Sequence, residues 1–599
     1  MASSKPPASP SPGGPEAGFG GGGISRGTLR RWRTWLEDLP WLLPAVAFVL
    51  LFSLLPLLDV FSQAWTFGHG VRGVIFLLRS NNVLGRATRE TLGNSLEQGV
   101  LSAGLASLWG VPVGVFLARN RFPGRDLLLA FLLVPFLLPV LVVVLGVQEL
   151  FTCPAQGACT GFLSSLWPSL GVLGSGLPGI LTVNVFYNTP MVALFTVAGI
   201  GQSSPAIEEA VATLGGGPWR AFRDAWGKHA LVGGATGALL TFLFSFLSFA
   251  PPLILGQYSN WTIEDWIYSL FQLRSTVVSP DLAVAVSLWT VLFLLGPSLL
   301  YVLLARHARL FGGTPRPVRT VRLGARSWRA LPFLAASAAL VGFVAVMIAS
   351  VLVGSFVVSN GTTLTSARLG TGNWLLLFSS RTTQALGGTS TMGAILNTVF
   401  FAVVVTLLLL LVALAAGFAR LRHPHVGSLV DLMSFVPMLV SPVILALALW
   451  LFYYGTLYVP AFLWVLIVGA QAGLALPFVL ETISLALRSH SRYPREAAQT
   501  LGARRFRAFL DADVPMAKEA LIAGALFAFA LSLGEFTATN FLYTPAYTTL
   551  VVEMYVLGLN HFSATAPGAA AAIGALLVVI SLVAFYIILG VGRRGHGRG

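Results

Sequence analysis

The chain has 599 residues, of which 56% are hydrophobic and only 10% are charged, and its mean hydropathy is +0.81. A soluble domain keeps roughly a quarter of its residues charged, so this composition excludes a water-facing globule. The net charge of +15 does not indicate a nucleic-acid partner, because the basic residues lie mainly in segments between apolar runs, as membrane topology predicts.

The first segment, residues 1–40, precedes any apolar run. Residues 1–25 are rich in Gly, Pro and Ser, which predicts a disordered tail rather than a signal peptide. We expect this tail to be cytoplasmic and the first span to act as an uncleaved insertion signal.

Twelve apolar runs follow, each close to the ~20 residues that a helix needs to cross a bilayer. Internal Pro and Gly do not argue against helices here, because membrane helices tolerate them. The sequence therefore predicts an all-α polytopic membrane protein in contact with lipid. The expected spans are Trp41–Trp65, Gly99–Ala118, Leu127–Leu150, Gly179–Ile200, Leu231–Leu255, Leu282–Leu304, Leu331–Val358, Met392–Phe418, Leu429–Tyr453, Val459–Leu487, Ala520–Leu542 and Gly568–Val591.

The basic residues predict the orientation of these spans. If the N-terminus is cytoplasmic and the spans alternate, all but seven of the 37 Lys and Arg residues fall on the cytoplasmic side. This bias follows the positive-inside rule. We therefore expect an inner-membrane protein with both termini, including a basic tail at 593–599, on the cytoplasmic side. The seven outer residues are Arg72, Arg79, Arg86, Arg89, Arg274, Arg368 and Arg381.

The second half of the chain repeats the first. Asn94 matches Asn397, 303 residues later, whereas Glu209 matches Glu496 after only 287 residues. An insertion of about 16 residues therefore lies in the first half, between its third and fourth spans. Six spans per half give both halves the same orientation, so the repeat is parallel, with a pseudo-two-fold axis along the membrane normal. The expected domains are 41–305 and 331–592, joined by an Arg-rich cytoplasmic linker at 306–330.

The chain has two cysteines, Cys153 and Cys159, and both lie in the inserted outer loop. They are either two free thiols or a short disulfide, which an oxidising outer compartment would permit. The spacing alone does not decide between these, because a disulfide depends on geometry. No His or Cys cluster has the spacing of a metal site, so we expect no bound metal.

Two loops, after the fourth and tenth spans, carry the same pattern. Glu209–Gly215 and Glu496–Gly502 each predict a short helix that ends at glycine, followed by a turn and a second short amphipathic helix. Aromatic residues share one face of each second helix. This duplication favours a docking surface, and the alternative is a pair of loop helices packed under their own bundle. The candidate residues are Glu209, Ala210, Gly215, Trp219, Phe222, Glu496, Ala497, Gly502, Phe506 and Phe509.

This pattern resembles the EAA loop of ABC importer permeases with the MetI-like fold of six-helix repeats. The second copy matches through Val514-Pro515, whereas the first copy has Gly227-Lys228 where the family usually has Leu-Pro. The resemblance implies that the two loops dock two copies of a separate ATPase subunit, which binds the ATP and Mg. It also implies an extracytoplasmic binding protein that delivers the substrate, and no cofactor in this chain.

The sequence contains no catalytic apparatus. A phosphate loop ends in Gly-Lys-Ser/Thr, and the nearest match, Gly227-Lys228-His229, lacks the hydroxyl residue. The chain is therefore not expected to be an enzyme. A secondary transporter with two parallel repeats is the alternative from another class, but the spans contain almost no acidic residues apart from Glu535 and Glu481.

Four residues within the spans are candidates for a substrate path. Glu535 is an intramembrane carboxylate, which is a functional hypothesis by default, although it could instead bond neighbouring backbone or seat the external binding protein. Asn184, Tyr187 and Asn188 could line a polar path or make interhelical hydrogen bonds.

Three stretches resemble a known family and so suggest the cargo. Residues 138–142, 246–251 and 262–268 look like a thiamine importer permease, which implies thiamine or its phosphates as cargo. Iron(III) permeases share the fused architecture and the Gly534–Phe536 stretch, so iron(III) is the alternative cargo.

Overall fold

The structure is a computed structural model that describes residues 41–596 with internal gaps. The predicted tail 1–40, most of the linker 306–330 and the last residues of the basic tail lie outside the described residues, as do Arg72, Arg274 and Arg381 and part of the ninth expected span. The gaps are 42, 67–74, 76–77, 154–158, 273–279, 308–320, 323–330, 359–367, 380–389, 423–439, 454–461, 490 and 560–565.

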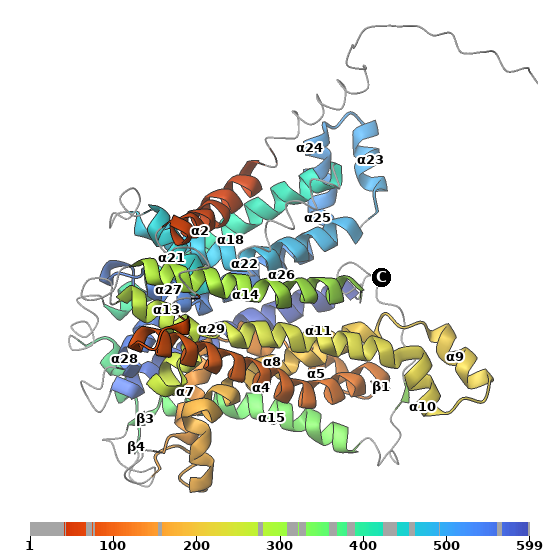
Figure 1. The fold of residues 1–599 in the computed structure, drawn as a ribbon. Helices are drawn as coiled ribbons and strands as arrows, with labels where there is room; N and C mark the ends of the chain where they lie inside the picture. The colour runs from red at the N-terminus through yellow and green to blue at the C-terminus, as the bar shows by residue number, and fades with distance from the viewer. Residues whose placement is uncertain are drawn as a thin grey trace, which may run out of the picture.

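The described residues form a helical bundle (Figure 1). The helices of the first half are α2 (Leu55–Thr66, continuous with a π turn at Leu50–Leu54), α4 (Val83–Arg119), α5 (Arg125–Phe131), α6 (Val134–Leu137), α7 (Val140–Phe151), α8 (Gly176–Ile200), α11 (Gly227–Phe246), α12 (Ala250–Leu255), α13 (Ile263–Gln272) and α14 (Pro280–His307). Those of the second half are α15 (Leu331–Gly354), α16 (Gly372–Leu377), α18 (Thr391–Arg422), α21 (Pro442–Tyr453), α22 (Leu463–Ser489), α26 (Lys518–Gly534), α27 (Thr537–Leu542), α28 (Leu550–Leu559) and α29 (Ala566–His596). Within the described ranges, strands are confined to two-residue ladders that pair β1 (Asn120–Arg121) with β2 (Val321–Arg322) and β3 (Val357–Val358) with β4 (Arg368–Leu369).

The all-helical membrane fold is confirmed. Among the described residues, nine helices are long and apolar enough to cross a bilayer, or eleven if two bent pairs each count as one span. The shorter apolar helix α21 belongs to the ninth expected span. The second span begins at Val83, well before the expected Gly99, because polar residues continue the helix beyond the apolar run.

Several expected spans are broken rather than continuous. The third bends by 98° between Leu137 and Val140, where Pro139 cannot donate a backbone hydrogen bond and forces Leu138 into an extended conformation. The fifth breaks after Phe246, and the eleventh after Gly534. The short helices α12 and α27 follow these two breaks.

The sequence repeat is also a structural repeat. Asn94 Nδ2 donates to the carbonyl oxygens of Ser259 and Trp261, at 2.9 and 3.0 Å. Asn397 makes the same two bonds, at 3.1 and 3.0 Å, to the carbonyls 287 residues after these two. Each asparagine thus joins the start of a long span to the segment before α13 or α28.

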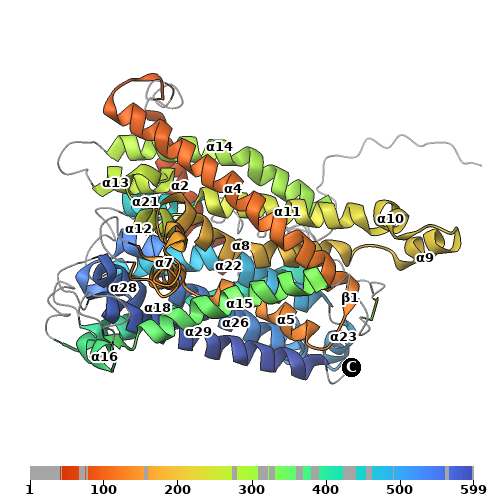
Figure 2. The same ribbon diagram turned by 90° about the horizontal axis from the view of Figure 1, so that it is seen from below.

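The two halves exchange their first spans. Figure 1 shows α2 beside α21 and α22 of the second half, where Tyr453 Oη donates to the Leu51 carbonyl at 2.9 Å. Figure 2 shows α15, the first span of the second half, beside α7, and there Trp109 Nε1 donates to the Ala336 carbonyl at 3.1 Å. Each half of the chain therefore packs against the first span of the other half.

Candidate functional site

The two EAA-like loops project from the same end of the bundle, where α29 also ends (Figure 1). The first loop contains α9 (Pro205–Thr213) and α10 (Pro218–Ala221), and the second contains α23 (Tyr493–Thr500) and α24 (Arg505–Ala508). Gly215 and Gly502 have φ of +71° and +91°, the left-handed conformation in which glycine ends a helix at little cost. The predicted helix–glycine–helix form is present in both loops.

The most exposed apolar side chains of the loops lie directly before these glycines. Leu214 is 82% exposed and Leu501 is 89% exposed, and the two occupy equivalent positions of the repeat. Glu209, Ala210, Glu496 and Ala497 are exposed as well. These leucines are not among the candidate residues of the sequence pattern, although each precedes a turn glycine in its copy of the loop.

The aromatic residues of the second loop face the bundle in this structure. Phe506 stacks on Trp41 with ring centroids 4.1 Å apart and meets Phe418 edge-on at 5.6 Å. Phe509 is 2% exposed and lies 5.0 Å from Phe418. These rings therefore pack the second loop against the first span and against α18.

The first loop holds its aromatic residues differently. Trp219 is 72% exposed and stacks on Phe222, which in turn meets Trp226 edge-on at 5.0 Å. Nearby, Arg223 donates two hydrogen bonds to Asp224 and so holds the pKa of that carboxyl below its usual range. The first loop thus presents an exposed ring at a position where the second loop has the inward-facing Phe506.

Each loop is anchored by an ion pair, but the residues differ. In the first, Arg119 at the end of α4 pairs with Glu208 through both carboxylate oxygens and lies 4.9 Å over the Trp226 ring. In the second, Arg495 occupies the position of Glu208 and pairs with Asp513 at 3.3 Å. The first anchor joins loop to span, whereas the second lies within the loop.

A cavity of about 740 Å³ lies between the two halves. Apolar and aromatic side chains dominate its lining, together with Tyr301, Gln471, Glu481, Thr482 and Glu535. The other lining residues are Leu133, Phe136, Leu137, Leu138, Met191, Leu194, Phe195, Leu240, Phe244, Leu247, Val440, Pro442, Leu474, Ala475, Pro477, Phe478, Phe527, Ala530, Leu531 and Gly534. Its volume and character suit a small organic ligand.

Glu535 lines this cavity, but its carboxylate is fully engaged with the chain that follows. One oxygen accepts from the Ala538 backbone N–H at 2.7 Å, and the other from the N–H and hydroxyl of Thr539 at 2.9 and 2.5 Å. The carboxylate therefore stabilises the turn into α27. This agrees with the alternative in which Glu535 bonds neighbouring backbone.

The three polar residues of α8 lie outside the lining of this cavity. Asn184 donates to Ser102 Oγ at 3.0 Å, and Asn188 donates to the Asn184 carbonyl at 2.8 Å and to Ser245 Oγ at 3.3 Å. Tyr187 Oη donates to the Leu138 carbonyl at 2.9 Å, at the break in the third span. These bonds join helices of the first half.

An aromatic pair lies directly after the broken fifth and eleventh spans. Phe249 and Phe536, which are equivalent in the repeat, stack with centroids 6.0 Å apart, and both are buried. Tyr268 and Tyr555, also equivalent, flank them at 5.2 and 5.0 Å. None of the four rings lines the cavity, although Leu247 and Glu535, which shortly precede Phe249 and Phe536 in the chain, do so.

A buried carboxyl group joins the two halves. Glu264, at the start of α13, is fully buried and accepts a hydrogen bond from the Ser441 hydroxyl, which lies at the break before α21. Ser441 also accepts from the Ile444 backbone N–H at 3.0 Å. In the sequence, Glu264 is notable only as a member of the stretch 262–268 that resembles a thiamine importer permease. Its neighbours in the sequence do not indicate a hydrogen-bond partner 177 residues away.

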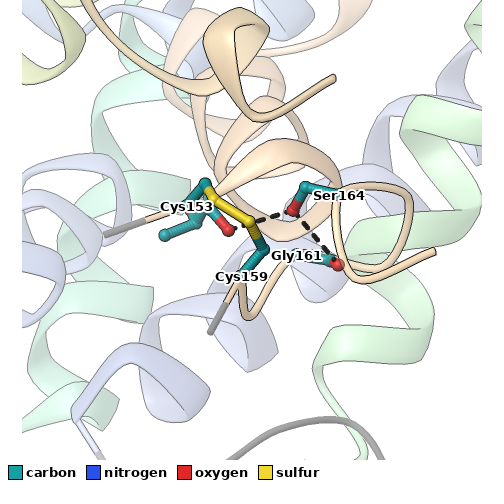
Figure 3. Close-up of a disulfide and its surroundings, with 5 residues drawn as sticks. Cys153, Cys159, Gly161 and Ser164 are labelled. Atoms are coloured by element: carbon teal, nitrogen blue, oxygen red, sulfur yellow. Dashed lines mark hydrogen bonds between the residues drawn. A yellow bond between two sulfur atoms is a disulfide. The ribbon is translucent and has the colours of Figure 1, made fainter. Parts of the chain in front are cut away.

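The inserted outer loop contains a disulfide between Cys153 and Cys159 (Figure 3), so the structure favours the bonded form of the two open alternatives. Ser164 Oγ donates to the carbonyls of Thr152 and Gly161, at 3.0 and 3.3 Å, and closes the loop beside the disulfide. No group of three or more His, Cys, Asp or Glu side chains in the described part of the chain could hold a metal.

Comparison with known proteins gives a family match and several relatives. Residues 110–310 and 410–594 match the family described as binding-protein-dependent transport system inner membrane component. The thiamine transport system permease protein of Salmonella typhimurium is 34% identical over 169 residues, which is 27% of this chain and 30% of that protein. The corresponding protein of Brucella abortus is 25% identical over 507 residues, 82% of this chain and 86% of that protein. A sulfate transport system permease protein of Synechococcus elongatus is 28% identical over 179 residues, 30% of this chain and 58% of that protein.

Proposed function

This chain belongs to the family of binding-protein-dependent transport system inner membrane components, and we propose that the cargo it imports is thiamine or a thiamine phosphate. The family assigns it the role of a multi-pass, non-catalytic permease in an ABC importer, with a separate ATPase that binds the ATP and a substrate-binding protein as partners. It also carries no cofactor of its own. Which substrate the permease admits is the open part of this function.

The cavity between the halves is the observation that supports thiamine. Aromatic rings line it, and its two acidic side chains, Glu481 and Glu535, are not matched by any basic residue in its lining. Such a surface favours an aromatic cation, which gains from both stacking and charge. The Brucella abortus thiamine permease aligns along most of both chains, in agreement with this cargo.

The other candidate cargoes fit the cavity less well. Sulfate, which one relative transports, is an anion that acidic side chains would repel. Iron(III), the alternative from the sequence, needs several oxygen ligands, and one of the two cavity carboxylates is already occupied by backbone and hydroxyl donors.

The loops support the way in which this permease would be coupled to ATP hydrolysis. Their exposed tips, Leu214 and Leu501, lie at one end of the bundle at equivalent positions, which suits two copies of one ATPase subunit. The expected coupling residues that are exposed remain candidates for this contact, whereas Phe506 and Phe509 pack against the bundle; the exposed ones are Glu209, Ala210, Gly215, Trp219, Glu496, Ala497 and Gly502. In this proposal the loop-bearing end and both termini are cytoplasmic, as the distribution of basic residues predicts.

The test is uptake by the complete complex. The permease, its ATPase and its binding protein are reconstituted in vesicles with ATP, and uptake of labelled thiamine, sulfate and iron(III) is measured. Thiamine uptake that depends on ATP and on the binding protein is expected. Uptake of sulfate or iron(III) in its place would show the cargo to be wrong, and thiamine uptake driven by a proton gradient without the ATPase would show the coupling to be wrong.

A further inference from the structure

The cavity is lined by equivalent faces of α8 and α22. α8 contributes Met191, Leu194 and Phe195, and α22 contributes the residues 287 positions later, Phe478, Glu481 and Thr482. Pro190 and Pro477 are equivalent as well, so both helices carry proline at the same level. The two walls are thus copies of one surface with different side chains.

The main difference between the walls is a charge. Glu481 on α22 stands where α8 has Leu194, so a carboxylate on one side of the cavity faces an apolar wall on the other. Both acidic residues of the lining come from the second half, which also contributes the rings of Phe478 and Phe527. The first half contributes no charged side chain to the lining, and its rings there are those of Phe136, Phe195, Phe244 and Tyr301. A ligand that is cationic at one end and aromatic at the other would match this arrangement.

The two carboxylates differ in their capacity to bind a ligand. The oxygens of Glu535 accept three hydrogen bonds from the turn into α27. Glu481 is half-buried and, within the described part of the chain, makes no hydrogen bond or ion pair, although it lies within electrostatic range of Arg420. Of the two, Glu481 therefore has oxygens available to a cation in the cavity.

Glu481 also lies toward the loop-bearing end of the cavity. It follows Gln471 by ten residues on α22, which is about 15 Å along a helix. α22 continues into the second loop, so a ligand that leaves the aromatic cluster at Phe249 and Phe536 would meet Glu481 at the far end of the cavity.

We propose that Glu481 is the counter-charge that binds a cationic, ring-bearing substrate in the cavity, while the aromatic wall of the first half holds the rings. This rests on the proposed import of thiamine and adds the residue that selects for positive charge. Glu535 instead has a structural role at the break in the eleventh span.

Three variants test this in the reconstituted complex. Glu481→Gln removes the charge and keeps the size, and we expect thiamine uptake at limiting substrate to fall about tenfold, the effect of losing one charge-assisted contact. Glu481→Asp keeps the charge and should retain most of the uptake. Asp126→Asn, at a side chain that is 93% exposed outside the cavity, is the matched control and should transport like the wild type.

A fourth variant uses the pseudo-symmetry of the cavity. Glu481→Gln combined with Leu194→Glu moves the carboxylate to the equivalent position on the opposite wall, and we expect it to recover part of the uptake. Stimulation of ATP hydrolysis by the binding protein is measured in parallel, because a defect in folding or coupling would abolish it, whereas loss of a substrate contact leaves it measurable.

Three kinds of result would overturn the inference. Uptake by Glu481→Gln at the wild-type level, or equal losses in Glu481→Gln and Glu481→Asp, would show that the charge is not used. Parallel loss of uptake and stimulated ATP hydrolysis would show that Glu481 is structural, for example as a partner of Arg420. If the wild type carried sulfate and not thiamine, the proposed function and this inference would both be wrong, whereas the first two results leave thiamine import intact.

Discussion

Single residues in this permease have roles that their chemistry alone does not reveal. Glu535 is the acidic residue that a reading of the sequence selects first, because it lies in an apolar span. In the structure its oxygens are engaged by the Ala538 and Thr539 backbone and by the Thr539 hydroxyl. Glu481, near the end of a span, keeps its oxygens available to the cavity.

The structural role of Glu535 predicts a loss of stability. Glu535→Ala leaves two backbone donors and one hydroxyl without their acceptor, which should lower stability by about 1–3 kcal/mol. Glu535→Gln retains one acceptor oxygen and should lose less. The measurement is the Tm of the purified complex in detergent, with Asp126→Asn as the control. An unchanged Tm together with abolished uptake would assign Glu535 to the substrate instead.

Among the elements, the two loops are unequal copies of one design. Both turn at a left-handed glycine and expose a leucine just before it. The second loop stacks Phe506 on Trp41 of the first span, whereas the first loop leaves Trp219 exposed and is tied to α4 by the Arg119–Glu208 pair. Motion of an ATPase would thus reach the membrane through different contacts in each half.

Equivalent exposure of the two leucines predicts equivalent contributions to ATPase binding. Burying a leucine is worth about 1.5–3 kcal/mol, so Leu214→Ala or Leu501→Ala should weaken co-purification of the ATPase, and the double variant should weaken it most. Leu299→Ala is the control, because Leu299 is 61% exposed on a membrane-spanning helix, away from both loops. If the ATPase co-eluted undiminished with the double variant, Leu214 and Leu501 would not be part of the interface.

At the scale of the whole molecule, local patterns in the sequence predicted the elements that local chemistry determines. Apolar runs gave the membrane-spanning helices, and the repeat gave matched contacts such as those of Asn94 and Asn397. The helix–glycine–helix form of the loops followed from Gly215 and Gly502.

Features that depend on partners distant in the chain were not predictable in this way. The breaks after Phe246 and Gly534 lie within the fifth and eleventh expected spans, so the limits of the apolar runs did not reveal them. The contact between Glu264 and Ser441, and the inward orientation of Phe506, depend on how the halves assemble. The exchange of first spans left no signal in hydropathy, because a lipid-facing and a partner-facing apolar helix have the same composition.

The exchange of first spans predicts a coupling between residues of different halves. A Cβ at Gly469 on α22 would lie 2.1 Å from Cδ1 of Phe52 in the first span, so Gly469→Val should overpack this contact and cost about 1–3 kcal/mol. In a Phe52→Ala background the same change should cost much less, because the ring is absent. Tm values of the four proteins in this double-mutant cycle measure the coupling.

Gly342→Val is the matched control for this cycle, because a Cβ at Gly342 on α15 would meet nothing within 4 Å. Equal costs of Gly469→Val with and without Phe52 would mean that the first span does not pack on the second half. A coupling of the expected sign would show that the first span packs on the second half in the folded protein. Because the halves are fused in one chain, this contact would form within one molecule, whereas two separate subunits would have to associate to form it.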